Sequence, residues 1–471
     1  MKKMKYIIYL FVALFATTSC EDFLNITPDG QAKRDELLST PQGIEDAMYG
    51  AYSQMRSTTL YGQELYFHTL EILAHNLECK DNTVLEPLAN FEFDNTGVKS
   101  LFEGIWTAMY KNISNVNSVL AAPLVAEAKE FPYTVYRGEA LGLRAFMHFD
   151  LVRLFAEQYT VNPEADGIPY ATEFSLKTPD FETLAKNYEH ILKDLLEAEK
   201  LLHGENEYEG VSNYMLDRQI HFNKYAVWAT LARVYLTMGD KGNAEKYADM
   251  VITDGKYMLK EKTEVVNDLA GVLSKKECLF GIYHAGFYTQ VSAKLQQMTS
   301  FYSLDLPKEF LKLYEKDASG SDFRTMAYFS ESGTGSSSKT RLCKFTDVYE
   351  LNNNVASRPA DLILGINMIR IPEMYYILAE VLLDKEPKMA LDYYNAVRKS
   401  RGLEAVADKA LTMGMINDER CKELVGEGQI YFNLKRQNLP IDAHDGNNTS
   451  FKPVDGIYVI PVPDIEKDNR N

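Results

Sequence analysis

Three glutamates near the C-terminal end have the spacing that comes nearest to catalytic chemistry. Glu419, Glu423 and Glu427 recur every four residues, so on a helix they would share one face. A pair of carboxylates can serve as the acid and base of a glycoside hydrolase. The same row, with Arg420 and Arg436 nearby, can instead form exposed or interhelical ion pairs. We favour the ion pairs and expect no catalytic residue in this chain.

The other residue types that act as nucleophiles or metal ligands are scattered. The eight histidines and five cysteines contain no H-E-x-x-H and no C-x-x-C, the spacings typical of zinc sites. His148 falls within an apolar helical stripe, which favours a packed histidine. The run GTGSSSKT at 333–340 is similar to a phosphate-binding loop, but Ser338 stands where the glycine before the lysine is required. We interpret that run as a surface loop and expect neither a metal nor a cofactor.

Aromatic residues are a more informative signal for binding. The chain has 30 Tyr and 23 Phe but only 2 Trp. Aromatic rings stack on sugar rings or peptide side chains, and tyrosine adds a polar tip. Two stretches without helical periodicity, 57–100 and 261–365, carry such residues, and loops of this length are usually functional. We predict that the ligand-binding residues include Asp81, Asn82, Phe91, Phe93, Tyr283, His284, Phe287, Tyr288 and Tyr302.

Each of these aromatic residues has an alternative role, which is packing beneath a long loop. Trp106 and Trp228 lie on the apolar stripes of predicted helices, so we do not expect either to form a binding platform.

The net charge of −17 limits the kind of partner. Loss of an N-terminal leader containing Lys2, Lys3 and Lys5 would take this charge to −20. A surface so acidic repels nucleic acid and anionic lipid. We therefore expect no nucleic-acid partner, and contact with a membrane only through an anchor.

Residues 1–20 have the pattern of a secretory signal. Three lysines precede an apolar run at 6–16, and Thr17-Thr18-Ser19-Cys20 follows. The apolar run is too short to span a bilayer. Cys20 resembles the lipidated cysteine of a bacterial lipobox, although Thr17 stands where leucine is usual. We predict a signal peptide at 1–19 and lipidation of Cys20; the alternative is an ordinary cleaved signal with an incidental cysteine.

A helical hairpin at 222–253 is the clearest element of the scaffold. Trp228, Leu231, Ala232 and Tyr235 have the spacing of a tetratricopeptide repeat, and Ala244 falls where the second helix of that repeat has its alanine. A similar series recurs at 371–400. Because such a hairpin cannot bury its apolar face alone, we predict a mainly all-α fold. It should contain about four helical pairs, with long irregular insertions that carry a few short strands.

Apolar stripes predict further helices at 101–121, 135–157 and 413–437. A helix should also begin at Thr40-Pro41, with the threonine as its N-cap and the proline in its first turn.

Several stretches resemble the SusD/RagB family of outer-membrane lipoproteins of the Bacteroidetes. They are CEDFLNITP at 20–28, RGEALGLRAFMHFDLVRLFA at 137–156, the two hairpins, INDERCKELVGEGQIYFNLKRQN at 416–438 and YVIPVPDIEKDN at 458–469. The chain departs from the family pattern between Ile430 and Asn433, where an arginine and an aspartate are replaced. It also lacks the family's common Asn-Pro-containing tail.

The resemblance implies one domain over 20–471. Its parts would be a tether at 20–40, three helical pairs at 41–260, an irregular ligand-side insertion at 261–365, and a fourth pair with the C-terminal segment at 366–471. It also implies an outer-membrane protein facing the cell exterior. Such a protein captures a nutrient, most often an oligosaccharide, for a SusC-like TonB-dependent transporter. Alternatives are a peptide-binding RagB-like subunit, a surface-anchored glycoside hydrolase and a purely structural repeat protein.

Overall fold

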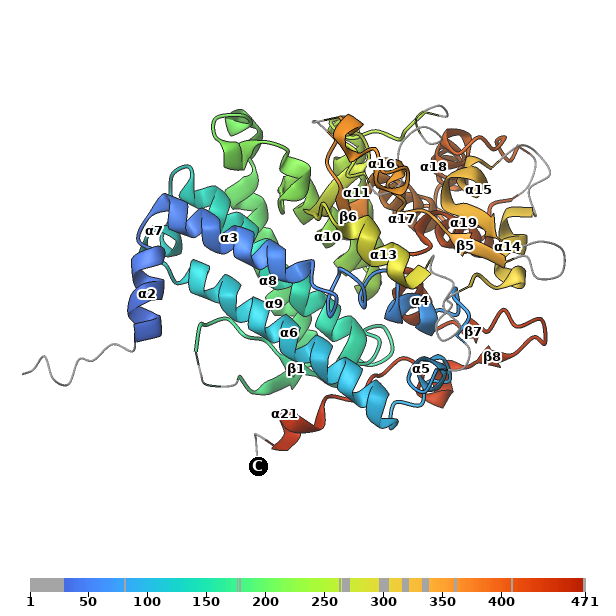
Figure 1. Cartoon of the computed structure of the whole chain (residues 1–471), viewed down its shortest axis with the longest axis horizontal. Coiled ribbons are helices and arrows are strands. Elements are labelled where there is room, and N and C mark those ends of the chain that lie inside the picture. The colour runs from blue at the N-terminus through green and yellow to red at the C-terminus, as the bar shows by residue number, and fades with distance from the viewer. Residues whose placement is uncertain are drawn as a thin grey trace, which may run out of the picture.

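The computed structural model describes most of the chain (Figure 1). The described residues are 29–79, 82–175, 177, 179–261, 264, 272–295, 305–315, 322–332, 339–359, 362–407 and 410–468. The predicted signal peptide at 1–19, the predicted lipidation site Cys20, most of the 333–340 run, and the candidate residues Asp81 and Tyr302 lie outside these ranges.

Helices packed in antiparallel pairs form the body of the molecule, which confirms the mainly α-helical, tetratricopeptide-like scaffold. Four pairs contact one another along their lengths. They are α3 (Pro41–Met55) with α6 (Thr96–Leu120), α8 (Tyr133–Phe155) with α9 (Leu184–Leu202), α10 (Lys224–Met238) with α11 (Lys241–Thr253), and α17 (Ile371–Val381) with α18 (Pro387–Ser400).

Shorter helices and strands fill the segments between these pairs. The short helices are α2 (Asp29–Leu37), α4 (Thr69–Leu73), α5 (Leu85–Ala89), α7 (Pro123–Ala126), α13 (Phe287–Leu295), α14 (Lys308–Glu315), α15 (Phe323–Tyr328), α16 (Val348–Leu351), α19 (Met413–Leu424), α20 (Ile430–Arg436) and α21 (Asp464–Asp468). The strands form two-stranded antiparallel sheets: β1 (Asp166–Pro169) with β2 (Phe181–Thr183), β3 (Cys278–Tyr283) with β6 (Gly365–Arg370), β4 (Phe329–Ser332) with β5 (Lys339–Leu342), and β7 (Ile441–Asp442) with β8 (Ser450–Phe451).

Local side-chain chemistry sets the helix boundaries. Thr40 accepts a hydrogen bond from the Gly43 amide at 3.1 Å, with Pro41 in the first turn, as predicted. The α10–α11 turn places Gly239 at φ 80°, a conformation that glycine adopts without strain, and Asp240 then caps α11.

The repeat residues of the α10–α11 hairpin form core contacts. Leu231, Ala232 and Ala244 are fully buried. The ring of Tyr235 stacks on that of Tyr247 with centroids 5.8 Å apart. The indole N–H of Trp228 donates to Glu199 at 3.1 Å, so this tryptophan belongs to the scaffold.

The predicted helix at 413–437 is wrong as a single element. It is two helices, α19 and α20, separated at 425–429. Gly426 and Gly428 have φ values of 81° and 69°, which a continuous α-helix does not contain. The amide of Gly428 donates to the buried Glu71 at 2.9 Å, so the break docks this segment onto α4.

The three spaced glutamates form buried ion pairs, although Glu427 lies beyond the end of α19 and some of the partners are not on helices. Glu419, Glu423 and Glu427 are 2%, 0% and 5% exposed. Their partners include Arg324 and Arg398 for Glu419, Arg370 and Arg401 for Glu423, and Arg370 and Lys344 for Glu427. Although burial raises the pKa of Glu423, the arginines hold it well below its usual value. This confirms the ion-pair interpretation: the carboxylates that the hydrolase alternative would use are engaged in these pairs.

Among the described residues, no helix has the length and apolar character needed to cross a membrane. The described residues also contain no metal-binding cluster, that is, no group of three or more His, Cys, Asp or Glu side chains placed to hold a metal ion.

Candidate ligand-binding site

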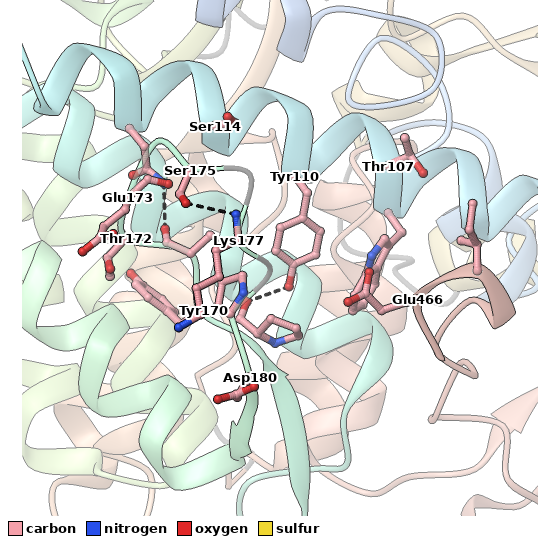
Figure 2. Close-up of a pocket in the computed structure, with 16 residues that line it drawn as sticks. Thr107, Tyr110, Ser114, Tyr170, Thr172, Glu173, Ser175, Lys177, Asp180 and Glu466 are labelled. Atoms are coloured by element: carbon pink, nitrogen blue, oxygen red, sulfur yellow. Dashed lines mark hydrogen bonds between the residues drawn. The ribbon is translucent and has the colours of Figure 1, made fainter. Parts of the chain in front are cut away.

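A pocket of about 530 Å³ lies between α6, the segment 169–180 and α21 (Figure 2). Two other pockets in the described residues measure about 40 Å³ each. Ligand sites generally measure about 300–1,000 Å³. The lining residues are Trp106, Thr107, Tyr110, Ser114, Asn117, Pro169, Tyr170, Ala171, Thr172, Glu173, Ser175, Lys177, Pro179, Asp180, Ile465 and Glu466.

One face of α6 supplies the wall above the pocket in Figure 2. Trp106, Tyr110, Ser114 and Asn117 follow one another at helical spacing, so they point to the same side. The Trp106 indole is only 3% exposed and packs edge-on against Phe155, with centroids 4.9 Å apart. The neighbouring Tyr110 ring is half-buried and presents more of its surface to the pocket.

Buried polar side chains hold the backbone of the opposite wall. The Tyr110 hydroxyl donates to the carbonyl of Pro169 at 2.7 Å. The Asn117 amide donates to the carbonyls of Ala171 and Glu173 at 2.9 and 3.3 Å. Because these carbonyls are satisfied from the helix side, residues 169–173 are held in place before any ligand arrives.

Arg144 from α8 adds a further tie to the same wall. Its guanidinium donates to the carbonyl of Thr172 and to the side-chain oxygen of Asn117, both at 3.0 Å. Two parallel bonds of 2.7 Å join it to Asp194 of α9, which balances the buried charge. The Tyr170 hydroxyl also donates to Asp194, at 2.6 Å.

His148 fixes the wall from below as a neutral, packed histidine, which confirms the sequence interpretation. Its Nε2 accepts the amide hydrogen of Ala171 at 3.0 Å, so Nδ1 carries the proton and donates to the Arg144 carbonyl at 2.9 Å. The imidazole stacks on the Tyr170 ring at 3.9 Å. Burial lowers the pKa of His148 to about 3, because the charged form would lose its hydration.

The charged groups on the pocket are on balance acidic. Glu173, Lys177 and Asp180 are exposed on the segment, and Glu466 lines the pocket from α21. Three carboxylates against one ammonium group leave an excess of negative charge. The site therefore suits neutral or cationic ligands better than anionic ones.

The structure places the candidate residues of the first irregular stretch in structural positions. Asn82 accepts hydrogen bonds from the amides of Val84 and Leu85 at 3.0 and 2.9 Å, in the turn that leads into α5. Phe91 packs edge-on against Phe451 with centroids 4.9 Å apart. Phe93 packs edge-on against Phe102 at 6.0 Å.

The candidate residues of the second stretch divide between surface and interior. Tyr283, at the end of β3, is 49% exposed, which is more than any other exposed aromatic residue in the described part of the chain. His284 follows it and contacts the Gln290 side chain at 3.1 Å. Phe287 and Tyr288 are 2% and 8% exposed. The structure thus brings Tyr283 and His284 to the surface with Phe287 packed below.

Sequence reasoning missed the pocket itself, including Tyr110, Asn117, Tyr170 and Lys177. One signal was available: Asn117 and Arg144 are polar residues on strongly apolar helices, and buried polar groups require partners. Nothing in the spacing, however, indicated that those partners were the carbonyls of 171–173.

Two family models match the chain. One, described as starch-binding and associating with the outer membrane, matches residues 22–236. The other, the SusD family, matches residues 311–459. A SusD-like protein P2 of Formosa agariphila is 24% identical, over 98% of this chain and 97% of its own length.

Solved structures share the fold over most of the chain. A SusD superfamily protein from Bacteroides thetaiotaomicron matches with a TM-score of 0.73 and 23% identity, over 91% of this chain and 97% of that one. A laminarin-binding SusD-like protein matches with a TM-score of 0.64 and 18% identity, over 87% and 98%. Because SusD family models match residues 22–236 and 311–459, which together make up most of the chain, the chain belongs to the SusD/RagB family, and the solved structures show that it shares their fold.

Proposed function

We propose that this protein captures a neutral oligosaccharide at the outer surface of the cell and delivers it to a SusC-like TonB-dependent transporter. One matching family model describes starch binding at the outer membrane, and one structural relative binds laminarin. We extend carbohydrate binding from these relatives to this chain, and we add the transporter as its partner.

The observation that carries the proposal is the pocket beneath α6. It combines a tyrosine ring with amide, hydroxyl and carboxylate groups, and a sugar needs both an apolar surface for its C–H face and partners for its hydroxyls. Its wall is held by Tyr110, Asn117, Arg144 and His148, so little ordering should be required on binding.

The Tyr283 surface is proposed as a second contact. Its exposed ring and the adjacent His284 provide a stacking face and a hydrogen-bonding group. Phe287 would act by supporting this surface, since its ring packs against Phe345 with centroids 5.6 Å apart.

The proposed ligand class is tested by a binding screen. The chain produced without residues 1–20 is titrated with neutral oligosaccharides and with oligopeptides in a calorimeter. Saturable binding of a glycan is expected. Binding of oligopeptides alone would contradict the oligosaccharide and favour the RagB-like alternative.

A filling substitution then tests the pocket with the glycan found. Ser114 lines the pocket and its hydroxyl makes no hydrogen bond to another side chain of the described residues, so Ser114→Trp should occupy the space without removing a side-chain contact that holds the wall. We expect affinity to fall at least tenfold, about 1.4 kcal/mol. Ser100→Trp, at an exposed position of the same helix, should bind as the unaltered chain does. Unchanged affinity in the Ser114→Trp variant would show that the glycan does not bind in this pocket.

The Tyr283 surface is tested in the same assay. Loss of a stacking ring costs about 0.5–1.5 kcal/mol, so Tyr283→Ala should weaken binding by about 2- to 12-fold. Tyr208→Ala removes another exposed ring, 37% exposed, and is the matched control. Equal affinities in the two variants would exclude Tyr283 as a contact.

A further inference from the structure

A second, much smaller pocket has four arginines among its twelve lining residues, against one carboxylate, that of Glu373. This groove of about 40 Å³ lies between α10, α17 and α20, near the C-terminal end of α8. Arg153, Arg233, Arg420 and Arg436 line it, together with Asn433. Such a concentration of positive charge is unexpected in a chain whose net charge is −17.

The arginines outnumber the carboxylates that pair with them. Arg153 pairs with Asp150. Arg233 pairs with Glu373 through bonds of 2.6 and 2.5 Å.

Arg420 and Arg436 share one carboxylate, that of Glu380, at 2.5 Å each. Four guanidinium groups therefore share three paired carboxylates, an excess of one positive charge within this set of ion pairs.

Three of the guanidinium groups also have an unused donor. Arg153, Arg233 and Arg420 are only 7%, 5% and 3% exposed. Each has one buried nitrogen with no hydrogen-bond partner within the described part of the chain: Nε of Arg153, Nη1 of Arg233 and Nη2 of Arg420. A buried donor without a partner costs about 1–3 kcal/mol, and more when the group is charged. All three donors belong to side chains that line this one groove, where an acceptor could satisfy them.

The lowered pKa values of two neighbouring basic groups agree with this excess of positive charge. Burial lowers the pKa of Arg436, and the Arg420 guanidinium lowers it further although Glu380 raises it. Burial, followed by the nearby Arg153, lowers the pKa of Lys435 to about 7.

We propose that this groove binds one small monovalent anion of the size of a carboxylate group. Hydrogen bonds from guanidinium groups to an anion are short and strong, and a bound anion would satisfy the three donors and the excess charge together. A site for one water needs about 10–15 Å³, so a groove of about 40 Å³ admits formate but not a sugar or a bulky sulfonate. The site is separate from the glycan pocket, with which it shares no lining residue.

The test uses formate as the probe and the chain without residues 1–20. Thermal unfolding is followed while sodium formate replaces the sodium salt of morpholinoethanesulfonate at constant ionic strength. A saturable rise in Tm is expected for the unaltered chain. A Tm that does not respond, or that rises linearly without saturating, overturns the proposal.

Arg420→Gln should abolish the response, and Glu380 would keep Arg436 as its partner. Arg137→Gln is the matched control, because Arg137 lies on α8 like Arg153 but does not line the groove. The control should respond as the unaltered chain does. A response that persists in Arg420→Gln contradicts the site.

A substitution that should stabilise the protein keeps the test decisive if Arg420→Gln does not fold. The Asn433 side-chain oxygen accepts from Arg420 at 3.1 Å and from Arg436 at 2.6 Å, so Asn433→Asp places a carboxylate between these guanidinium groups. We expect this variant to have a higher Tm than the unaltered chain without formate, and no further rise with formate. A lower Tm together with a retained formate response would overturn the proposal.

Discussion

At the scale of single residues, His148 links the pocket wall to pH. Its pKa is about 3 in the folded chain and about 6.5 in an unfolded one, so the unfolded state binds the proton first as pH falls. The contribution of His148 to stability is thus complete above about pH 6.5 and decreases as pH falls toward 3. Between pH 6.5 and 5.5 this single group should cost about 1 kcal/mol of unfolding free energy.

The measurement is urea unfolding at pH 6.5 and 5.5 for the unaltered chain and for His148→Phe, which keeps a ring against Tyr170. His75, whose pKa burial lowers to about 4, contributes to both proteins, so the difference between their pH dependences isolates His148. The variant should be less stable overall but less sensitive to pH. The same loss in both proteins would show that His148 is not buried as a neutral group.

Residue types alone predicted some individual roles and not others. The spacing of the glutamates and the stripe around His148 were sufficient, because periodicity determines which residues face the core. An aromatic residue in an irregular segment gives no such period. Tyr283 therefore lies at the surface and Phe287 in the core, although the sequence predicts both as ligand-binding residues.

At the scale of elements, the α10–α11 hairpin should be a main source of stability. Leu231 is fully buried in it, so Leu231→Ala should lower the unfolding free energy by about 2–5 kcal/mol, through lost burial and the cavity left behind. Leu216→Ala makes the same chemical change at a side chain that is 48% exposed, and should cost far less. Urea unfolding measures both, and equal losses would argue against the hairpin as core.

The helices were predictable because their apolar stripes are long, but their ends and breaks were less so. The 413–437 segment kept its stripe across 425–429, where tertiary contacts break the helix and join Gly428 to Glu71. A hydrogen bond between residues so far apart in the chain leaves no trace in local periodicity.

At the scale of the whole molecule, the proposed lipid anchor and the proposed transporter determine where in the cell the protein acts. Cys20→Ala should release the protein from the membrane fraction, because no lipid could be attached. Fractionation of cells, with detection by an antibody against the chain, measures this; retention in the membrane would contradict lipidation.

The proposed transporter is tested by purification in mild detergent. The unaltered protein should co-purify with a large outer-membrane barrel, and repeated absence of one would count against the transporter.

The pocket depends on how distant parts of the chain pack together, which explains why the sequence alone did not predict it. Its walls come from α6, from the segment 169–180 and from α21, which lie far apart in the chain. The packing of α6 on α8, and of β1 on both α8 and α9, brings the first two walls together, and an ion pair between Lys99 and Asp464 joins α6 to α21.

The most direct test of the account compares a neutral oligosaccharide with a uronic-acid or sulfated one of equal length. Calorimetric affinities are measured for the chain without residues 1–20 at low and at physiological salt. The three carboxylates of the pocket and the net charge of −17 predict tighter binding of the neutral glycan, by a margin that is larger at low salt. Tighter binding of the anionic glycan, or no glycan binding at all, would contradict the account.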